Sequence, residues 1–124
     1  MRSQAVTRIM ELYASDAMLD GILAMTRFRN QHGQNFADMF RLLREANDRS
    51  IAAVDYGRRR FGEYFNVLAT LWELGLISER DVRQIVWPAQ RALYKETVEP
   101  LERQILAGEP DGPHKRLLGV LGLE

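Results

Sequence analysis

Three consecutive arginines, Arg58, Arg59 and Arg60, are the side chains whose type and spacing most suggest chemistry. They lie in the segment YGRRRFG, and arginine is the residue that most often binds phosphate groups and other anions. On a helix, however, three consecutive side chains fan over about 200° and form no single stripe. Asp55 and Glu63 also stand at helical pairing distance. The arginines are therefore candidate anion contacts, but a salt-paired, solvated helix face is favoured over a nucleic-acid site.

Carboxylates and the two histidines are the remaining candidates for chemistry. General acid–base catalysis needs a carboxyl group that is tuned by burial or by a like-charged neighbour. Glu63 adjoins an apolar stripe and is the candidate for partial burial, although a structural ion pair with Arg59 or Arg60 is favoured. Neither His32 nor His114 has a carboxylate or a second histidine at i+3 or i+4, so we predict no metal site and no cofactor. The other carboxylates that could form an acid–base pair are Asp16, Asp20, Asp55 and Glu73.

Composition places the chain among ordinary globular domains. Its 124 residues suit one domain, with 46% hydrophobic and 27% charged residues. Seventeen basic and seventeen acidic side chains cancel, so no overall field draws it to nucleic acid or anionic lipid. It has no cysteine, no apolar run of membrane-spanning length and no signal-peptide pattern at its start. These features predict a cytoplasmic protein without a transmembrane segment.

Apolar residues recur at helical spacing almost throughout, and no stretch has the alternation of a strand. The sequence therefore predicts an all-α bundle of about five helices, the fourth of them long, with a short C-terminal tail helix. The expected helix N-caps are Ser3, Ser15, Asn35, Asp48 and Ser78. The expected inward positions are Val6, Ile9, Met10, Tyr13, Met18, Leu19, Ile22, Leu23, Thr26, Phe36, Met39, Phe40, Leu43, Ile51, Val54, Phe61, Tyr64, Phe65, Leu68, Leu71, Trp72, Val82, Ile85, Val86, Ala89, Leu93 and Leu101.

The segment LWELGLISERDV marks a corner between the fourth and fifth helices. Gly75 can take the left-handed conformation that ends a helix. Ser78 and Asp81 have the spacing of a capping box that begins the next one. Pro88 and Pro100 then lie within the fifth helix, where each removes a backbone donor and predicts a kink or restart.

This corner, with the aromatic residues around it, resembles a bacterial domain-of-unknown-function family, number 4760. The matching residues are Tyr64, Phe65, Gly75, Leu76, Ile77, Ser78, Tyr94 and Pro100, and the likeness could extend over residues 5–106. The chain departs from the family pattern at Ser78 and Asn66, where acidic residues are usual. Many members carry a membrane segment ahead of the domain, and we expect none in this chain. The resemblance implies a small helical domain and implies no catalytic residue.

Glycines and the C-terminal tail say more about packing than about catalysis. Gly57 and Gly62 flank the arginines without a phosphate-loop context, so we expect them to admit a neighbouring helix.

The chain divides into a helical domain over residues 1–108, a turn connector over 109–113 and an apolar tail over 114–124. The tail is leucine-rich and a poor helix alone, so we expect it to dock in an apolar groove on this chain or on a partner.

Binding to another protein, self-association included, is the function that these features favour. The candidate interface residues are Trp72, Trp87, Leu117, Leu118 and Leu121, with packing in the core as the alternative for both tryptophans. A small apolar ligand or lipid held between helices, with Arg58 at the mouth, is the second hypothesis. An enzyme that uses Glu63 or another partly buried carboxylate is the third.

Overall fold

The computed structural model describes residues 4–105 and 112–123, apart from the side chains of residues 5, 112 and 113. Within these ranges the chain is built from helices and turns and contains no strand, which confirms the all-α prediction. Ser3 and connector residues 109–111 lie outside the described residues. The elements are α1 (Gln4–Tyr13), α2 (Asp16–His32), η1 (Gly33–Asn35), α3 (Phe36–Glu45), η2 (Arg49–Ile51), α4 (Ala52–Glu73), α5 (Glu79–Ile85), α6 (Pro88–Leu93), η3 (Tyr94–Val98), α7 (Glu99–Arg103) and α8 (Gly112–Val120).

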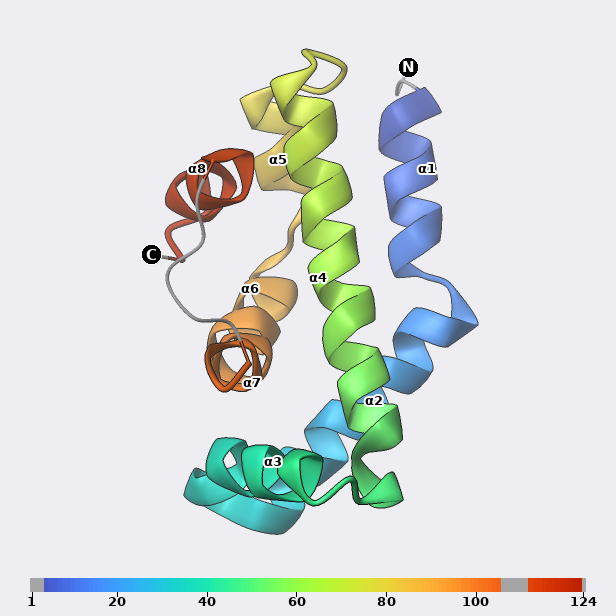
Figure 1. Ribbon diagram of the computed structural model, residues 1–124. Coiled ribbons are helices and arrows are strands. Elements are labelled where there is room, and N and C mark those ends of the chain that lie inside the picture. The colour runs from blue at the N-terminus through green and yellow to red at the C-terminus, as the bar shows by residue number, and fades with distance from the viewer. Residues whose placement is uncertain (1–3, 106–111, 124) are drawn as a thin grey trace.

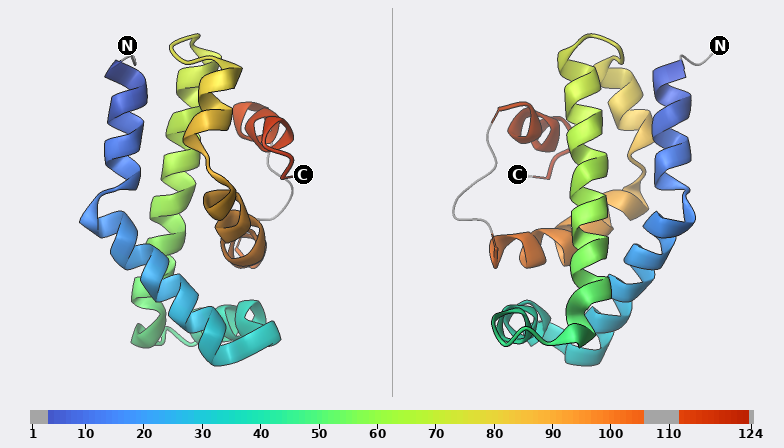
Figure 2. Two further views of the ribbon diagram at one scale, coloured as in Figure 1. Left: turned by 180° about the vertical axis from the view of Figure 1, so that it is seen from behind. Right: turned by 45° about the vertical axis from the view of Figure 1, so that its right-hand side comes forward.

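The long helix α4 is the axis of the molecule (Figure 1). Helix α2 crosses it, α1 runs beside its C-terminal half, and α3 lies at its N-terminal end. From the corner after α4 the chain turns back through α5 and then α6, η3 and α7, and α8 packs on the outer side of α4. The view from behind and the view turned by 45° show the same arrangement of helices around α4 (Figure 2). Every other layer therefore depends on the position of this helix.

Side-chain caps define several helix starts as the sequence predicts. The Ser15 hydroxyl accepts a hydrogen bond from Met18 N at 3.3 Å at the start of α2. Asp48, expected to cap the long helix itself, instead caps η2, the turn that leads into α4, where its Oδ1 accepts from Ser50 N at 2.8 Å. Ser78 and Asp81 form the full capping box at the start of α5, with bonds of 3.1 and 2.9 Å. Asn35 stands at the N-cap of α3 but makes no side-chain cap bond.

Two glycines let α2 and α4 cross in backbone contact. A Cβ atom added at Gly57 would lie 2.4 Å from the Gly21 carbonyl oxygen, and one added at Gly21 would lie 2.6 Å from the Gly57 Cα atom. Neither distance can hold a real side chain, so both positions require glycine. The expected close packing at Gly57 is confirmed, and its partner is Gly21. At Gly62 an added Cβ atom would instead meet the flexible side chain of Glu102 at 3.1 Å, so the expected close helix contact is not found at that position.

Aromatic rings fill the centre of the bundle on the buried face of α4. Phe61 and Phe65 lie 5.1 Å apart between ring centroids, and Tyr94 stacks on Phe65 at 4.9 Å. Tyr13 approaches Tyr64 at 5.1 Å from the side of α1. These contacts join α1, α4 and η3 into one core, which also takes in the α8 leucines.

Three expected core positions are wrong. Leu19 and Leu23 are about half exposed, because the buried side of α2 is set by Met18, Gly21 and Met25. The contact between Gly21 and Gly57 directs this face of α2 toward α4. The face that carries Leu19 and Leu23 is therefore left exposed. Ala89 is exposed as well.

The two prolines act differently from each other. At Pro88 the chain breaks: Val86 and Trp87 are extended, and Pro88 takes the first turn of α6, where its missing N–H costs nothing. Pro100 interrupts nothing, because the preceding residues Tyr94–Val98 form a π-helical turn in which Glu99 N bonds to Tyr94 O. The wider turn accommodates the proline ring. One expected helix is therefore two segments, with α6, η3 and α7 continuous.

We predict that replacing Gly75 with valine lowers the free energy of unfolding by about 1–3 kcal/mol. Gly75 has φ of +75° and open space around its Cα atom, so backbone strain is the only cost. Asparagine tolerates this conformation and is the matched control, with a loss below about 1 kcal/mol. Urea denaturation of both variants measures the difference. Equal stabilities of the valine and asparagine variants would show that left-handed strain is not the cause.

Candidate functional site

Trp87 is the most unusual surface residue of the described chain. Its side chain stands at the break between α5 and α6, and the residue is 59% exposed. Residues before proline are restricted to extended conformations, so Pro88 holds Trp87 out of either helix. Arg91 fixes the break by donating hydrogen bonds to Val86 O at 3.0 Å and Arg83 O at 3.2 Å. The alternative prediction, that Trp87 packs in the core, is therefore wrong. Its exposure follows from the extended backbone at the break before Pro88.

A shallow recess of about 50 Å³ opens beside the Trp87 ring. Its lining comes from α1 and α5: Val6, Met10, Asp81, Gln84 and Ile85, together with Trp87 itself. We call these six residues the Trp87 patch. An exposed tryptophan beside apolar side chains with a polar rim is the composition of a protein interface hot spot. The recess is several times smaller than the roughly 300 Å³ at which small-molecule pockets begin, so it does not favour an apolar ligand at this place.

Arg58 is buried, which corrects the expectation that all three arginines are solvated. Its guanidinium donates to Asp55 Oδ1 at 2.9 and 3.0 Å and to Glu102 Oε2 at 3.0 Å. Burial raises the pKa of Glu102, and the adjacent Arg58 offsets this only in part. Gly62 leaves room for the Glu102 carboxylate, whose Oε1 lies 3.1 Å from the Cβ position of that glycine. Arg58 thus joins α4 to α7 and is unavailable as an anion contact or at a ligand pocket.

Arg59 keeps the surface role that the sequence predicts, whereas Arg60 is partly buried and its Nε atom is buried without a hydrogen-bond partner among the described residues. Arg59 is exposed and its Nε lies 3.6 Å from Asp55 Oδ2. Arg60 is 3.5 Å from Glu63 and lies over the ring of Tyr56, 5.9 Å from its centroid. Each guanidinium is near a carboxylate, which weakens the local positive field and the case for a nucleic-acid site.

We predict that Arg58→Gln destabilises the protein by about 2–4 kcal/mol, because it removes the buried cation that joins Asp55 to Glu102 and leaves the half-buried Glu102 carboxylate without it. Arg59→Gln is the matched control on the same helix. The Arg59 guanidinium is exposed and lies 3.6 Å from Asp55, so its removal should change stability by less than about 0.5 kcal/mol. Urea denaturation at neutral pH compares them, and equal effects would mean that the Arg58 network contributes no more than a surface pair.

Of the carboxylates named for an enzyme, Glu63 is not buried, whereas the partly buried Asp55 and Glu102 are both bound to Arg58. The Glu63 side chain is 60% exposed beside Arg60, so the expected partial burial of Glu63 is wrong. Tyr64 is buried and donates to Gln90 Oε1 at 3.2 Å. Burial and the nearby Tyr13 raise the pKa of Tyr64, which therefore stays protonated and acts as a structural donor. Asp16 and Asp20 are both exposed on α2.

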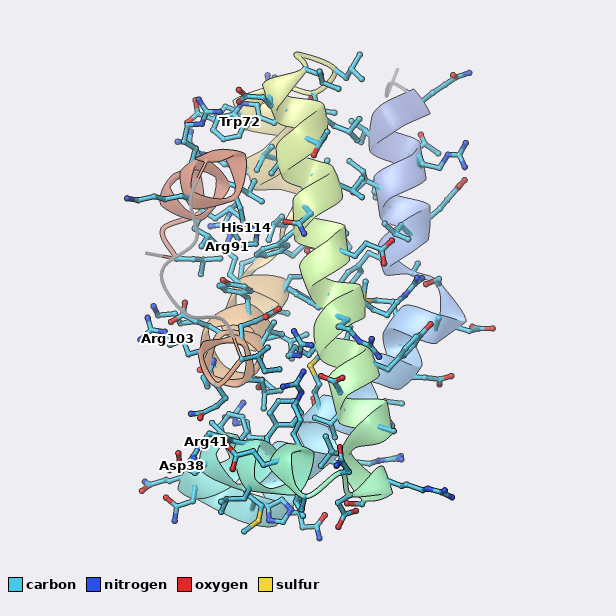
Figure 3. All side chains as sticks on the ribbon, in the orientation of Figure 1. Asp38, Arg41, Trp72, Arg91, Arg103 and His114 are labelled. Carbon is cyan, nitrogen blue, oxygen red and sulfur yellow. The ribbon has the colours of Figure 1, made fainter. Side chains whose placement is uncertain are left out.

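The tail helix docks on this same chain. Leu117, Leu118, Leu121 and Leu123 are all buried. Polar contacts flank them: His114 Nδ1 lies 2.9 Å from Asn66 Oδ1, and Arg116 pairs with Glu73. The three tail leucines predicted as interface candidates therefore belong to the core of this chain. Trp72, labelled in Figure 3, is partly buried and packs against that core.

Neither histidine belongs to a group of potential metal ligands in the part of the chain that the structure describes. The His32 ring packs on Phe28 with 4.4 Å between centroids. Among the described residues no group of three or more His, Asp or Glu side chains could hold a metal ion. Within the same residues, no helix is both long and apolar enough to cross a bilayer.

Comparisons with known proteins add no assignment. No family model matches the chain, and neither a curated protein nor a solved structure matches it. The resemblance to family 4760 stays a prediction from the motif around Gly75.

Proposed function

We propose that this chain is a non-enzymatic protein-interaction domain or accessory subunit, and that the Trp87 patch is its contact surface. One observation carries the proposal: a tryptophan is held out of the fold by a proline-enforced break, beside an apolar recess. Burying an exposed tryptophan in a partner would remove a large apolar area from water, and tryptophan is the residue type most enriched in interface hot spots.

The surroundings of Trp87 fit a protein partner. Asp81 and Gln84 give the patch a polar rim, while Val6, Met10 and Ile85 supply its apolar floor. The α5 side is fixed at both ends, since Asp81 belongs to the capping box of α5 and Arg91 binds Val86 O at the end of that helix. A preformed contact surface loses little conformational freedom on binding. A second copy of this chain and a different protein are both partners of this chemistry.

The test compares the size of the assembly that contains this chain in extracts of its source cell. Trp87→Gln should leave the fold intact and shift the chain from a larger assembly to its monomer position in gel filtration. Leu42→Gln is the matched control, because Leu42 is also exposed, at 51%, but lies on α3 at the far end of α4 from α5 (Figure 1). A wild-type chain that elutes as a monomer would contradict the proposal, as would equal effects of the two variants.

A further inference from the structure

Helix α8 packs against α4 on a face that the Trp87 patch does not include. We call the apolar surface of α4 and the adjoining core that α8 covers the apolar seat. The leucines that α8 buries alternate with Gly119 and Gly122, which weaken the helix when it stands alone. Its last turn is closed by hydrogen bonds from Leu121 N to Leu117 O and from Leu123 N to Leu118 O. The order of α8 therefore depends on its docking, and a loss of docking opens these two bonds.

His114 is the titratable group placed to control that docking. It lies in the first turn of α8, half-buried, with its ring 6.4 Å from the Phe65 ring between centroids. Asn66 Oδ1 can only accept, so the 2.9 Å contact requires a proton on His114 Nδ1. A second proton on Nε2 would leave this hydrogen bond intact but place a full charge at a half-buried position.

Among the described residues, the Asn66 Oδ1 acceptor favours that charge, while burial of the ring and several nearby features oppose it. The N-terminus of a helix is its positive end, and α8 has no acidic residue in its first turn. Lys115 and Arg116 follow directly in the sequence. On α4 the carboxylates are already paired, Glu73 with Arg116 and Glu63 with Arg60.

The elements on the other side of the seat add no free carboxylate. From η3 the buried Tyr94 stacks on Phe65. From α6 comes the cation Arg91, which Figure 3 shows on the same side of α4 as His114 and which is held by backbone carbonyls. On α5, Glu79 is paired with Arg83 at 2.7 Å. Among these charged groups of the described residues, no carboxylate is left over to stabilise an imidazolium.

We propose that α8 is an acid-released strap: protonation of His114 weakens its docking on α4 and uncovers the apolar seat together with the four leucines. The proposal is independent of the Trp87 patch, because it concerns a different face and requires no partner.

The direction of the pH dependence follows from linkage. Burial lowers the pKa of His114 below its ordinary value of 6.5 while α8 is docked. The released strap binds the proton more tightly, so docking is strongest above about pH 6.5 and weakens as the pH falls through that value toward the lowered pKa. In this window the docking constant falls by up to about tenfold per pH unit, because one proton is taken up on release.

Hydrogen exchange of the backbone amides of Leu121 and Leu123 measures the docking. Their protection factors, corrected for intrinsic exchange, should fall between about pH 7.5 and about pH 5, the range in which histidine titrates. The amide of Leu74, bonded to Thr70 O at the end of α4, is the reference that should keep its protection.

Two substitutions make the test specific, because the chain has two histidines and no cysteine. His114→Asn keeps a donor near the Nδ1 position without a titrating ring, so its α8 amides should stay equally protected over the whole range. His32→Asn is the matched control and should behave like the wild type. The proposal is overturned if the wild-type α8 amides keep their protection in acid, or if His114→Asn loses protection in parallel with the wild type.

Discussion

Gly57→Ala is expected to cost more than about 3 kcal/mol of folding free energy, a loss larger than that expected for a typical single substitution. The added methyl group would lie 2.4 Å from the Gly21 carbonyl oxygen and 2.8 Å from its Cα atom. Backbone atoms cannot rotate away as a side chain can, so α2 would have to move off α4. Because α4 is the axis on which the other layers pack, the whole fold should respond, and urea denaturation measures the loss.

Gly62→Ala separates this clash from the general effect of alanine in a helix. Gly62 lies on the same helix, but the contact of its added methyl would be the end of the Glu102 side chain, at 3.1 Å. Alanine also favours the helix by up to about 1 kcal/mol over glycine. The net change should therefore stay within about 1 kcal/mol. If Gly57→Ala is as mild as Gly62→Ala, α2 and α4 are not in backbone contact.

Deleting residues 112–124 is the second change with a large expected effect. It removes four leucines that are each at most 6% exposed, and each buried leucine side chain contributes about 1.5–3 kcal/mol before ordering costs. We expect the melting temperature of the truncated chain to fall by more than about 10 °C. Sedimentation should show the same assembly state before and after truncation, because the helix docks on its own chain.

Leu117→Ala and Lys115→Ala test the same helix without removing it. Leu117 is fully buried, so its truncation should cost about 2–4 kcal/mol. Lys115 is exposed on the same helix and should matter by less than about 0.5 kcal/mol. An unchanged melting temperature after the deletion, or equal effects of the two substitutions, would contradict the docking of α8 on α4.

Local signals in the sequence predict the elements of this fold well. Ser15, Asp48, Ser78 and Gly75 act through hydrogen bonds or backbone angles within a few residues, so their roles can be read from spacing alone. The helical class likewise follows from the periodicity of apolar residues. Short-range chemistry of this kind needs no knowledge of how the helices pack.

Long-range contacts explain what the sequence could not show. The burial of Arg58 depends on Glu102, 44 residues away, and only the packing of α7 on α4 brings them together. Leu19 and Leu23 satisfy helical periodicity, yet Gly21 faces α4 because glycine alone permits the closest approach. The signal for Gly21 was its residue type in the middle of a helix, where glycine is costly without a packing reason.

The exposure of Trp87 could be predicted from the sequence, but the recess beside it could not. Trp87 before Pro88 predicts an extended residue at a helix restart, and this is what exposes the ring. The recess beside it could not be predicted, because it needs α1 to lie against α5.

Native mass spectrometry of the chain isolated from its source cell tests the proposed interaction most directly, because it weighs whatever is bound. We predict a complex with the added mass of a protein, or of a second copy, for the wild type and Leu42→Gln but not for Trp87→Gln. Two results would contradict the proposed interaction: a wild-type chain that carries only the mass of a small molecule, or the mass of the unbound chain for the wild type and both variants.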